Sequence, residues 1–211
     1  MNQRFFVFFY VDNPEVEEYL NLAIFVANPL EKWPAHVTVA GPFPHRNSVP
    51  KAVPFHSEVN VRGVGRFNGS GQNTVFLNVE SDELRKYWNK PDYGYNPHIT
   101  IYDGDDPKLA DMIYISLKTL DPFFSFPVKK LKRVKSVKGG PSILHSTVHQ
   151  RSIKNVLRMD SKVVYSFSVL ERVKAVSDAI RKAQDVSLSP ERSSISSKAY
   201  WEDTFLFDDY Q

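Results

Sequence analysis

Two segments of the same form, His36–Val39 (HVTV) and His98–Ile101 (HITI), constrain the fold of this 211-residue chain more than any other feature. Each alternates a polar residue with a β-branched apolar residue, which is the period of a strand with one buried face. On such a strand, histidine and threonine share one face while valine or isoleucine point into a core. The chain therefore has to form two strands that each hold an imidazole beside a hydroxyl.

Both of these strands follow a predicted strand and helix, and this repeated order predicts two similar lobes. The first set is a buried, central strand at Arg4–Val11 and a helix from Pro14 to about Val26, with Asn13 as its N-cap. The other predicted elements, in chain order, are a strand at Ala35–Ala40, a hairpin of Phe55–Val64 and Thr74–Val79, a helix from Ser81 to about Trp88, a strand at His98–Tyr102, a helix from Asp106-Pro107 to about Thr119, and a strand at Phe124–Val137.

The composition is that of a folded globular protein. Hydrophobic residues make up 42% of the chain and charged residues 24%, and there is no cysteine. The lack of cysteine excludes disulfides, thiolate metal sites and cysteine nucleophiles. The apolar run Phe5–Val11 is far shorter than the ~20 residues of a membrane helix, and acidic residues follow it. We therefore expect no signal peptide, no membrane partner and a cytoplasmic location.

The character of the chain changes after Gly139-Gly140-Pro141. Apolar residues then recur at helical spacing and predict one amphipathic helix from about Ser161 to Gln184. A serine-rich connection leads from there to an aromatic, acidic tail at Trp201–Tyr210. These changes divide the chain into a domain at residues 1–137 and a C-terminal extension at residues 138–211.

The positive net charge of +3 comes from a local cluster in the last predicted strand of the domain and directly after it. Six basic residues lie there with no acidic residue between them: Lys129, Lys130, Lys132, Arg133, Lys135 and Lys138. Such a cluster is typical either of contact with a nucleic-acid backbone or of a solvated strand face. In the first case, the acidic tail can occupy the same surface as an intramolecular mimic of RNA.

The residue types of the two segments suit acid–base chemistry. An imidazole ordinarily titrates near pH ~6.5, so it can give or take a proton at neutral pH. A threonine hydroxyl can donate a hydrogen bond to an anionic oxygen. Two such pairs supply an acid, a base and two donors, whereas a single pair is typical of ordinary hydrogen bonding within a strand.

The paired motifs, about sixty residues apart and with Pro97 before the second histidine, resemble those of the two-histidine (2H) phosphoesterase superfamily. The resemblance covers roughly residues 1–137. It implies an α+β, bilobal fold in which two antiparallel sheets, flanked by helices, enclose a central cleft, with the helical extension added. It also implies that His36 and His98 act as acid and base, and that Thr38 and Thr100 bind phosphate oxygens. Neither a metal nor a cofactor is expected in this family.

The resemblance implies a metal-independent phosphodiesterase that acts on RNA or nucleotides, at a 2′,3′-cyclic phosphate or a 2′-linked phosphodiester. Aromatic residues near the motifs are candidates for stacking on a base: Tyr95, Tyr93, Phe43 and Trp88. Of these, Phe43 and Trp88 are at least as well suited to the core. An alternative substrate is a 2′,5′-oligoadenylate or a cyclic-oligonucleotide signal. An alternative of another class is a noncatalytic RNA-binding module, although binding alone needs no pair of titrating groups.

Overall fold

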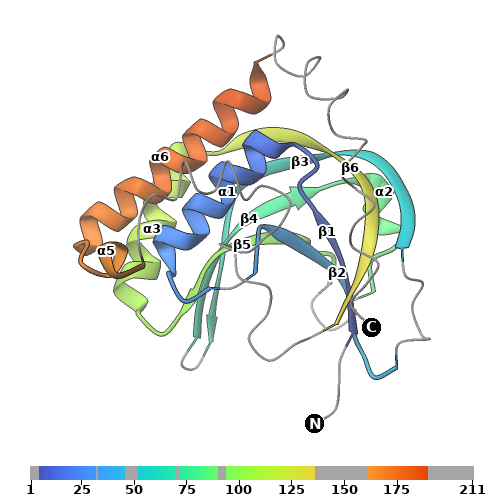
Figure 1. Ribbon diagram of the computed structural model, residues 1–211, viewed down its shortest axis with the longest axis horizontal. Coiled ribbons are helices and arrows are strands. Elements are labelled where there is room, and N and C mark those ends of the chain that lie inside the picture. The colour runs from blue at the N-terminus through green and yellow to red at the C-terminus, as the bar shows by residue number, and fades with distance from the viewer. Residues whose placement is uncertain are drawn as a thin grey trace.

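Antiparallel strands and packed helices make up the part of the chain that the computed structural model describes, namely residues 5–31, 33–45, 52–69, 72–89, 94–135 and 161–189. The elements, shown in Figure 1, are β1 (Phe5–Tyr10), α1 (Pro14–Ala27), β2 (His36–Phe43), β3 (Ala52–Gly69), β4 (Gln72–Glu80), α2 (Asp82–Arg85), β5 (His98–Gly104), α3 (Pro107–Leu120), β6 (Phe123–Lys135), α5 (Ser161–Tyr165) and α6 (Val169–Leu188).

The strands form one sheet that closes on itself in the order β1-β2-β5-β4-β3-β6. The α+β class and the antiparallel pairing are as expected, but the expectation of two separate sheets is not met. The reason lies in β3, which is long enough to pair with β4 over Asn60–Gly69 and with β6 over Ala52–Arg62. Because β6 also pairs with β1, the two predicted lobes share one hydrogen-bonded sheet.

The predicted starts of the first and third helices are confirmed by their caps. The Asn13 side chain accepts hydrogen bonds from two backbone amides of α1, and the Asp106 side chain accepts one from Leu109 N at the start of α3. Ser81 caps α2 as predicted, but α2 ends at Arg85 rather than near Trp88. Short polar side chains satisfy the first amides of a helix, so they locate its start better than its end.

The single helix predicted over Ser161–Gln184 is wrong, because the structure has two helices there. Ser168 begins α6 with a capping box: its side chain accepts a hydrogen bond from the amide of Glu171, whose side chain accepts one from the amide of Ser168. The N-cap residue is not helical, so the box separates α6 from α5. The apolar spacing continues across the break and conceals it.

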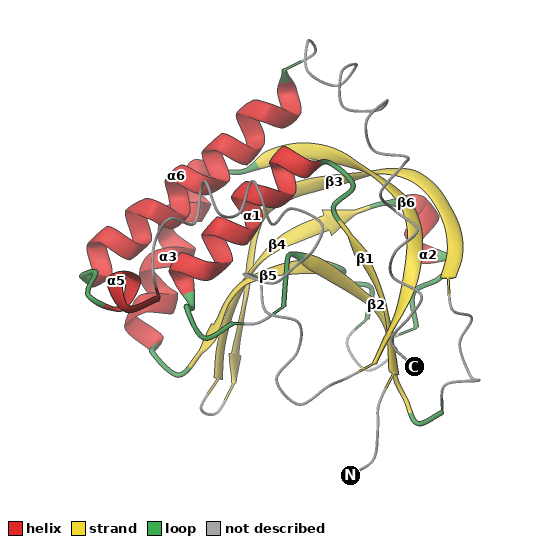
Figure 2. Ribbon diagram, viewed as in Figure 1, coloured by secondary structure: helices red, strands yellow, loops and turns green. Residues whose placement is uncertain are grey.

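The long helices α1, α3 and α6 lie together on one side of the sheet (Figure 2). From α6, Val176 and Ile180 are fully buried in the same core as α1 and the strands. The predicted boundary near residue 137 lies outside the described residues. Within the described residues, no helix has both the length and the apolar character needed to cross a membrane.

Candidate functional site

The two motif strands, β2 and β5, are antiparallel neighbours in the sheet, with Val37 opposite Ile99. Both of these side chains have 0% exposure, and the polar residues on either side of them are partly exposed. In an antiparallel pair, residues equally far from a facing pair lie at the same level. His36 is therefore level with Thr100, and His98 is level with Thr38, so all four side chains share one face of the sheet.

Both histidines make the same hydrogen bond to the backbone. Nδ1 of His36 lies 2.7 Å from the carbonyl oxygen of Pro34, and Nδ1 of His98 lies 2.8 Å from that of Asn96. A carbonyl only accepts, so Nδ1 carries the proton in each ring. The neutral imidazole then has its basic lone pair on Nε2, which is the form that a general base needs.

The residues just before each histidine are also held in place. Buried Asn21 of α1, only 1% exposed, accepts a hydrogen bond of 2.7 Å from the amide of Ala35. On the other strand, the carbonyl of Pro97 accepts one of 3.0 Å from the amide of Val79. Helix and sheet thus fix the backbone next to both imidazoles, as a preorganised site requires.

A phenylalanine from a neighbouring strand packs on each imidazole. Phe8 of β1 stacks on His36 with ring centres 4.2 Å apart and planes 23° apart. Phe76 of β4 packs on His98 with ring centres 4.6 Å apart. In register, Phe8 faces Thr38 and Phe76 faces Thr100, so the two halves of the site are built alike.

Neither phenylalanine was predicted from the sequence to lie at the site. They lie far from the motifs along the chain, so only strand pairing brings them there. The sequence of β1 does contain one indication: Phe6, Phe8 and Tyr10 alternate along the strand and so share one face. Pairing with β2 puts this face beside His36 and Thr38. We interpreted that strand as buried on both sides, which hid its aromatic face.

Two cavities lie near the motif strands, and one of them is lined by motif residues. A smaller one of about 200 Å³ is lined by His36 and Thr100, together with Trp33 and the end of α1. A larger one of about 530 Å³ has none of the four motif residues in its lining. It comes near the second motif through Asn78, the register partner of His98, and through Asn96 and Pro97, which directly precede His98.

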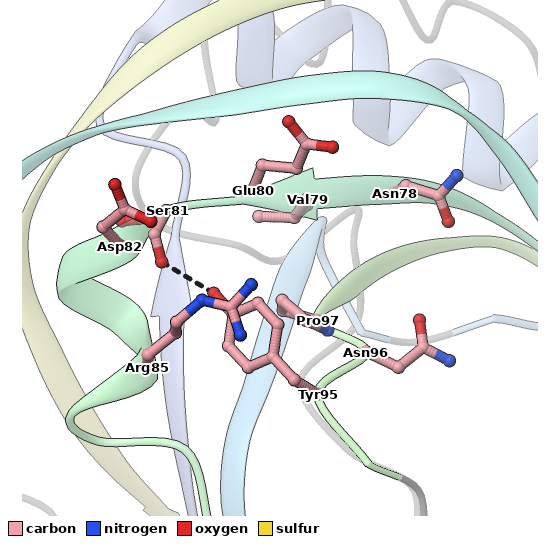
Figure 3. Close-up of a pocket in the computed structure, with 9 residues that line it drawn as sticks. All are labelled: Asn78, Val79, Glu80, Ser81, Asp82, Arg85, Tyr95, Asn96 and Pro97. Carbon is pink, nitrogen blue, oxygen red and sulfur yellow. Dashed lines mark hydrogen bonds between the residues drawn. The ribbon is translucent and has the colours of Figure 1, made fainter.

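Tyr95, a predicted base-stacking residue, lines the larger cavity (Figure 3). Its hydroxyl donates a hydrogen bond of 2.7 Å to the carbonyl of Ser81, and the Arg85 guanidinium lies 4.0 Å from the ring centre. Burial raises the pKa of this hydroxyl. Arg85 already covers one ring face, so a stacked base would have to use the other face or displace Arg85.

Of the other predicted aromatic residues, Phe43 and Trp88 make their contacts away from the histidines. Phe43, at the far end of β2, packs against the hydrophobic core, and Tyr93 lies outside the described residues. Trp88 packs edge-on against Tyr95 with ring centres 5.5 Å apart, and its Nε1 donates to the carbonyl of Gly94. The acidic tail at Trp201–Tyr210 also lies outside the described residues.

No group of three or more metal-ligating side chains occurs within the part of the chain that the structure describes. The arrangement instead offers two imidazoles with the same backbone-bonded nitrogen and two hydroxyls, all on one face. Chemically, this set is suited to moving two protons around an anionic centre while hydroxyls donate to its oxygens.

The family model of the 2'-5' RNA ligase superfamily matches residues 25–140, which is just over half of the chain and includes both motifs. No curated protein matches the chain significantly.

Proposed function

Since the chain belongs to the 2'-5' RNA ligase superfamily, which is the superfamily of two-histidine phosphoesterases, we propose that it is a metal-independent RNA or nucleotide phosphodiesterase. In this proposal His36 and His98 are the acid and base, and Thr38 and Thr100 bind the nonbridging phosphate oxygens. The observation that carries it is the pairing of Val37 with Ile99, because that pairing brings the four side chains onto one face.

With a 2′,3′-cyclic phosphate as substrate, one neutral histidine takes a proton from water through Nε2. The water oxygen bonds to phosphorus, and the bond from phosphorus to one ribose oxygen breaks. The other histidine, as imidazolium, protonates that leaving oxygen from Nε2 and becomes neutral. The threonine hydroxyls donate to the two nonbridging oxygens, where negative charge concentrates.

With a 2′,5′-linked substrate, the base instead activates the ribose 3′-hydroxyl. Its oxygen attacks phosphorus, the 5′-oxygen of the next nucleotide leaves with a proton from the acid, and a 2′,3′-cyclic phosphate forms. The two histidines have equivalent backbone hydrogen bonds, so the proposal leaves open which one is the acid. Substrates of this second kind include 2′,5′-oligoadenylate.

The test is metal-free turnover of a panel containing 2′,3′-cyclic nucleotides, a cyclic-phosphate RNA end and 2′,5′-oligoadenylate. We expect His36→Ala and His98→Ala each to lose about 10²–10⁴-fold in kcat, the usual contribution of general acid–base catalysis. His56→Ala, which removes an exposed imidazole from β3, is the matched control and should keep full activity. EDTA should leave the turnover of the wild type unchanged.

The pH–rate profile provides a second readout. The mechanism needs one neutral and one protonated imidazole, so kcat/KM should follow a bell-shaped curve. A flat profile between about pH 5 and 8 would contradict the assignment. If no substrate is cut while short RNA still binds, the chain is a noncatalytic RNA-binding module instead.

A further inference from the structure

The two halves of the site differ in the residue that faces each phenylalanine from the next strand of the sheet. In the first half, register places Thr38 of β2, Phe8 of β1 and Lys132 of β6 in one row. In the second half, the matching row is Thr100 of β5, Phe76 of β4 and Gly65 of β3. Facing residues of paired strands project to the same side of the sheet, so Lys132 shares the face of the motifs.

Lys132 is held in this face beside an aromatic ring. Its Nζ lies 5.4 Å from the ring centre of Tyr10, and Tyr10 faces His36 in the register of β1 and β2. Burial, assisted by the neighbouring charge of Lys130, lowers the pKa of the Lys132 ammonium, and the carboxylates of Asp12 and Glu17 act in the opposite direction. Among the described residues neither carboxylate forms a salt bridge with Lys132, so a bound anion would further offset the cost of its burial.

The row of the second half ends without charge. Gly65 has no side chain, and the ring of Phe76 fills the space where one would lie. The side chain of Phe67 lies beside this row; it is 40% exposed and has its ring centre 4.5 Å from that of Phe76 and 5.5 Å from that of His98. This row therefore ends on aromatic rings without a charge, whereas the matching row of the first half ends on the Lys132 ammonium.

The spacing of the strands sets the distance at which Lys132 acts. Two strand spacings separate it from Thr38, which is roughly 10 Å between backbones. A phosphate bound by the motif threonines therefore lies about one nucleotide along the chain from the Lys132 ammonium. Lys132 is suited to the next phosphate along a nucleotide chain.

We propose that Lys132 binds the phosphate adjacent to the scissile one, on the His36 side, and so makes the site selective for oligonucleotides over mononucleotides. This inference rests on the proposed function. Lys132 then fixes the direction in which an oligonucleotide crosses the two similar halves of the site. The rest of the sugar–phosphate chain lies at the His36 end.

The experiment compares two substrates that differ by one internucleotide phosphate: a mononucleotide 2′,3′-cyclic phosphate and a dinucleotide that ends in one. Lys132→Met removes the charge but keeps the length of the side chain. We expect it to raise KM for the dinucleotide about tenfold with kcat unchanged, and to leave both constants for the mononucleotide unchanged. Lys174→Met, an exposed site on α6, is the control for net charge.

Two further readouts separate binding from folding. Lys132→Arg should restore most of the dinucleotide preference, because it restores the charge. Added salt should reduce the preference of the wild type and leave that of Lys132→Met unaffected. Equal losses on both substrates, or no loss on either, would overturn the proposal.

The result also remains informative if the proposed function fails. In that case the wild type cuts neither substrate, and both serve as stable ligands for equilibrium binding. The expected tenfold weakening then appears in the Kd of Lys132→Met for the dinucleotide alone, and equal affinity of Lys132→Met and Lys174→Met would refute the inference.

Discussion

Gly65 shows how a single residue far from the motifs controls the packing of one imidazole. A side chain on Gly65 would overlap the ring of Phe76, which itself packs on His98. The ring is only 3% exposed and has little room to turn. Gly65 thus helps to position His98, because it leaves room for Phe76, and it has no such role at His36.

We predict that Gly65→Ala displaces Phe76 and with it His98. Overpacking of this kind costs about 1–3 kcal/mol in unfolding free energy, and a displaced imidazole should reduce kcat about tenfold or more. In NMR spectra the imidazole signals of His98 should shift while those of His36 stay. Adding Phe76→Leu should recover stability by making room, and an unchanged His98 signal in Gly65→Ala would show that the ring is not displaced.

At the scale of elements, local capping decides where the C-terminal helices begin and end. The amphipathic spacing runs on from α5 into α6, yet the capping box of Ser168 and Glu171 starts a new helix. The hydrogen bonds from Ser168 lower the pKa of the Glu171 carboxyl. A depressed pKa means that the folded state favours the charged form, so this carboxylate stabilises the fold.

The sign of that shift predicts a pH-dependent effect of Glu171→Ala on thermal stability. The contribution of Glu171 is fully present above the ordinary pKa of 4.5 and is lost as pH falls through the lower pKa of the folded state. The Tm of the wild type should therefore exceed that of Glu171→Ala at pH 7, and the gap should narrow below pH 4.5. Asp185→Ala, later in α6, controls for charge; a gap that widens in acid would contradict the assignment.

At the scale of the whole molecule, a side chain of α6 caps the C-terminal end of α1, a helix that comes early in the chain. The Arg172 guanidinium donates to the carbonyls of Val26 and Ala27, which are orphan acceptors at the C-terminal end of α1. The last turn of α1 has no basic residue of its own. A side chain from the extension thus supplies the positive charge that a helix C-terminus favours.

We expect Arg172→Met to lower the unfolding free energy by about 1.5–3 kcal/mol, since hydrogen bonds from a charged donor are lost at a partly buried site. Arg181→Met is the matched control, because Arg181 is exposed and pairs with Asp178 on its own helix. That control should cost at most about 0.5 kcal/mol. Equal losses in denaturant unfolding would mean that Arg172 does not cap α1.

Much of the local structure was predictable from the sequence, as was the placement of histidine and threonine on one face of each motif strand. The alternation of each motif predicted which side chains are buried, and Val37 and Ile99 are indeed fully inaccessible. Asn13 and Asp106 marked the starts of their helices. These features depend on steric and hydrogen-bonding rules that act within about four residues, so the sequence by itself determines them.

Only the tertiary structure decided how those parts meet. The pairing of Val37 with Ile99, the closure of the sheet through β3 and β6, and the phenylalanines beneath the imidazoles all join residues far apart in the chain. Strand register is set by which faces can be buried together, a property of the whole core that no short segment contains. For the same reason, Lys132 appeared in the sequence as one of six clustered charges, and strand pairing alone placed it in the row of Thr38.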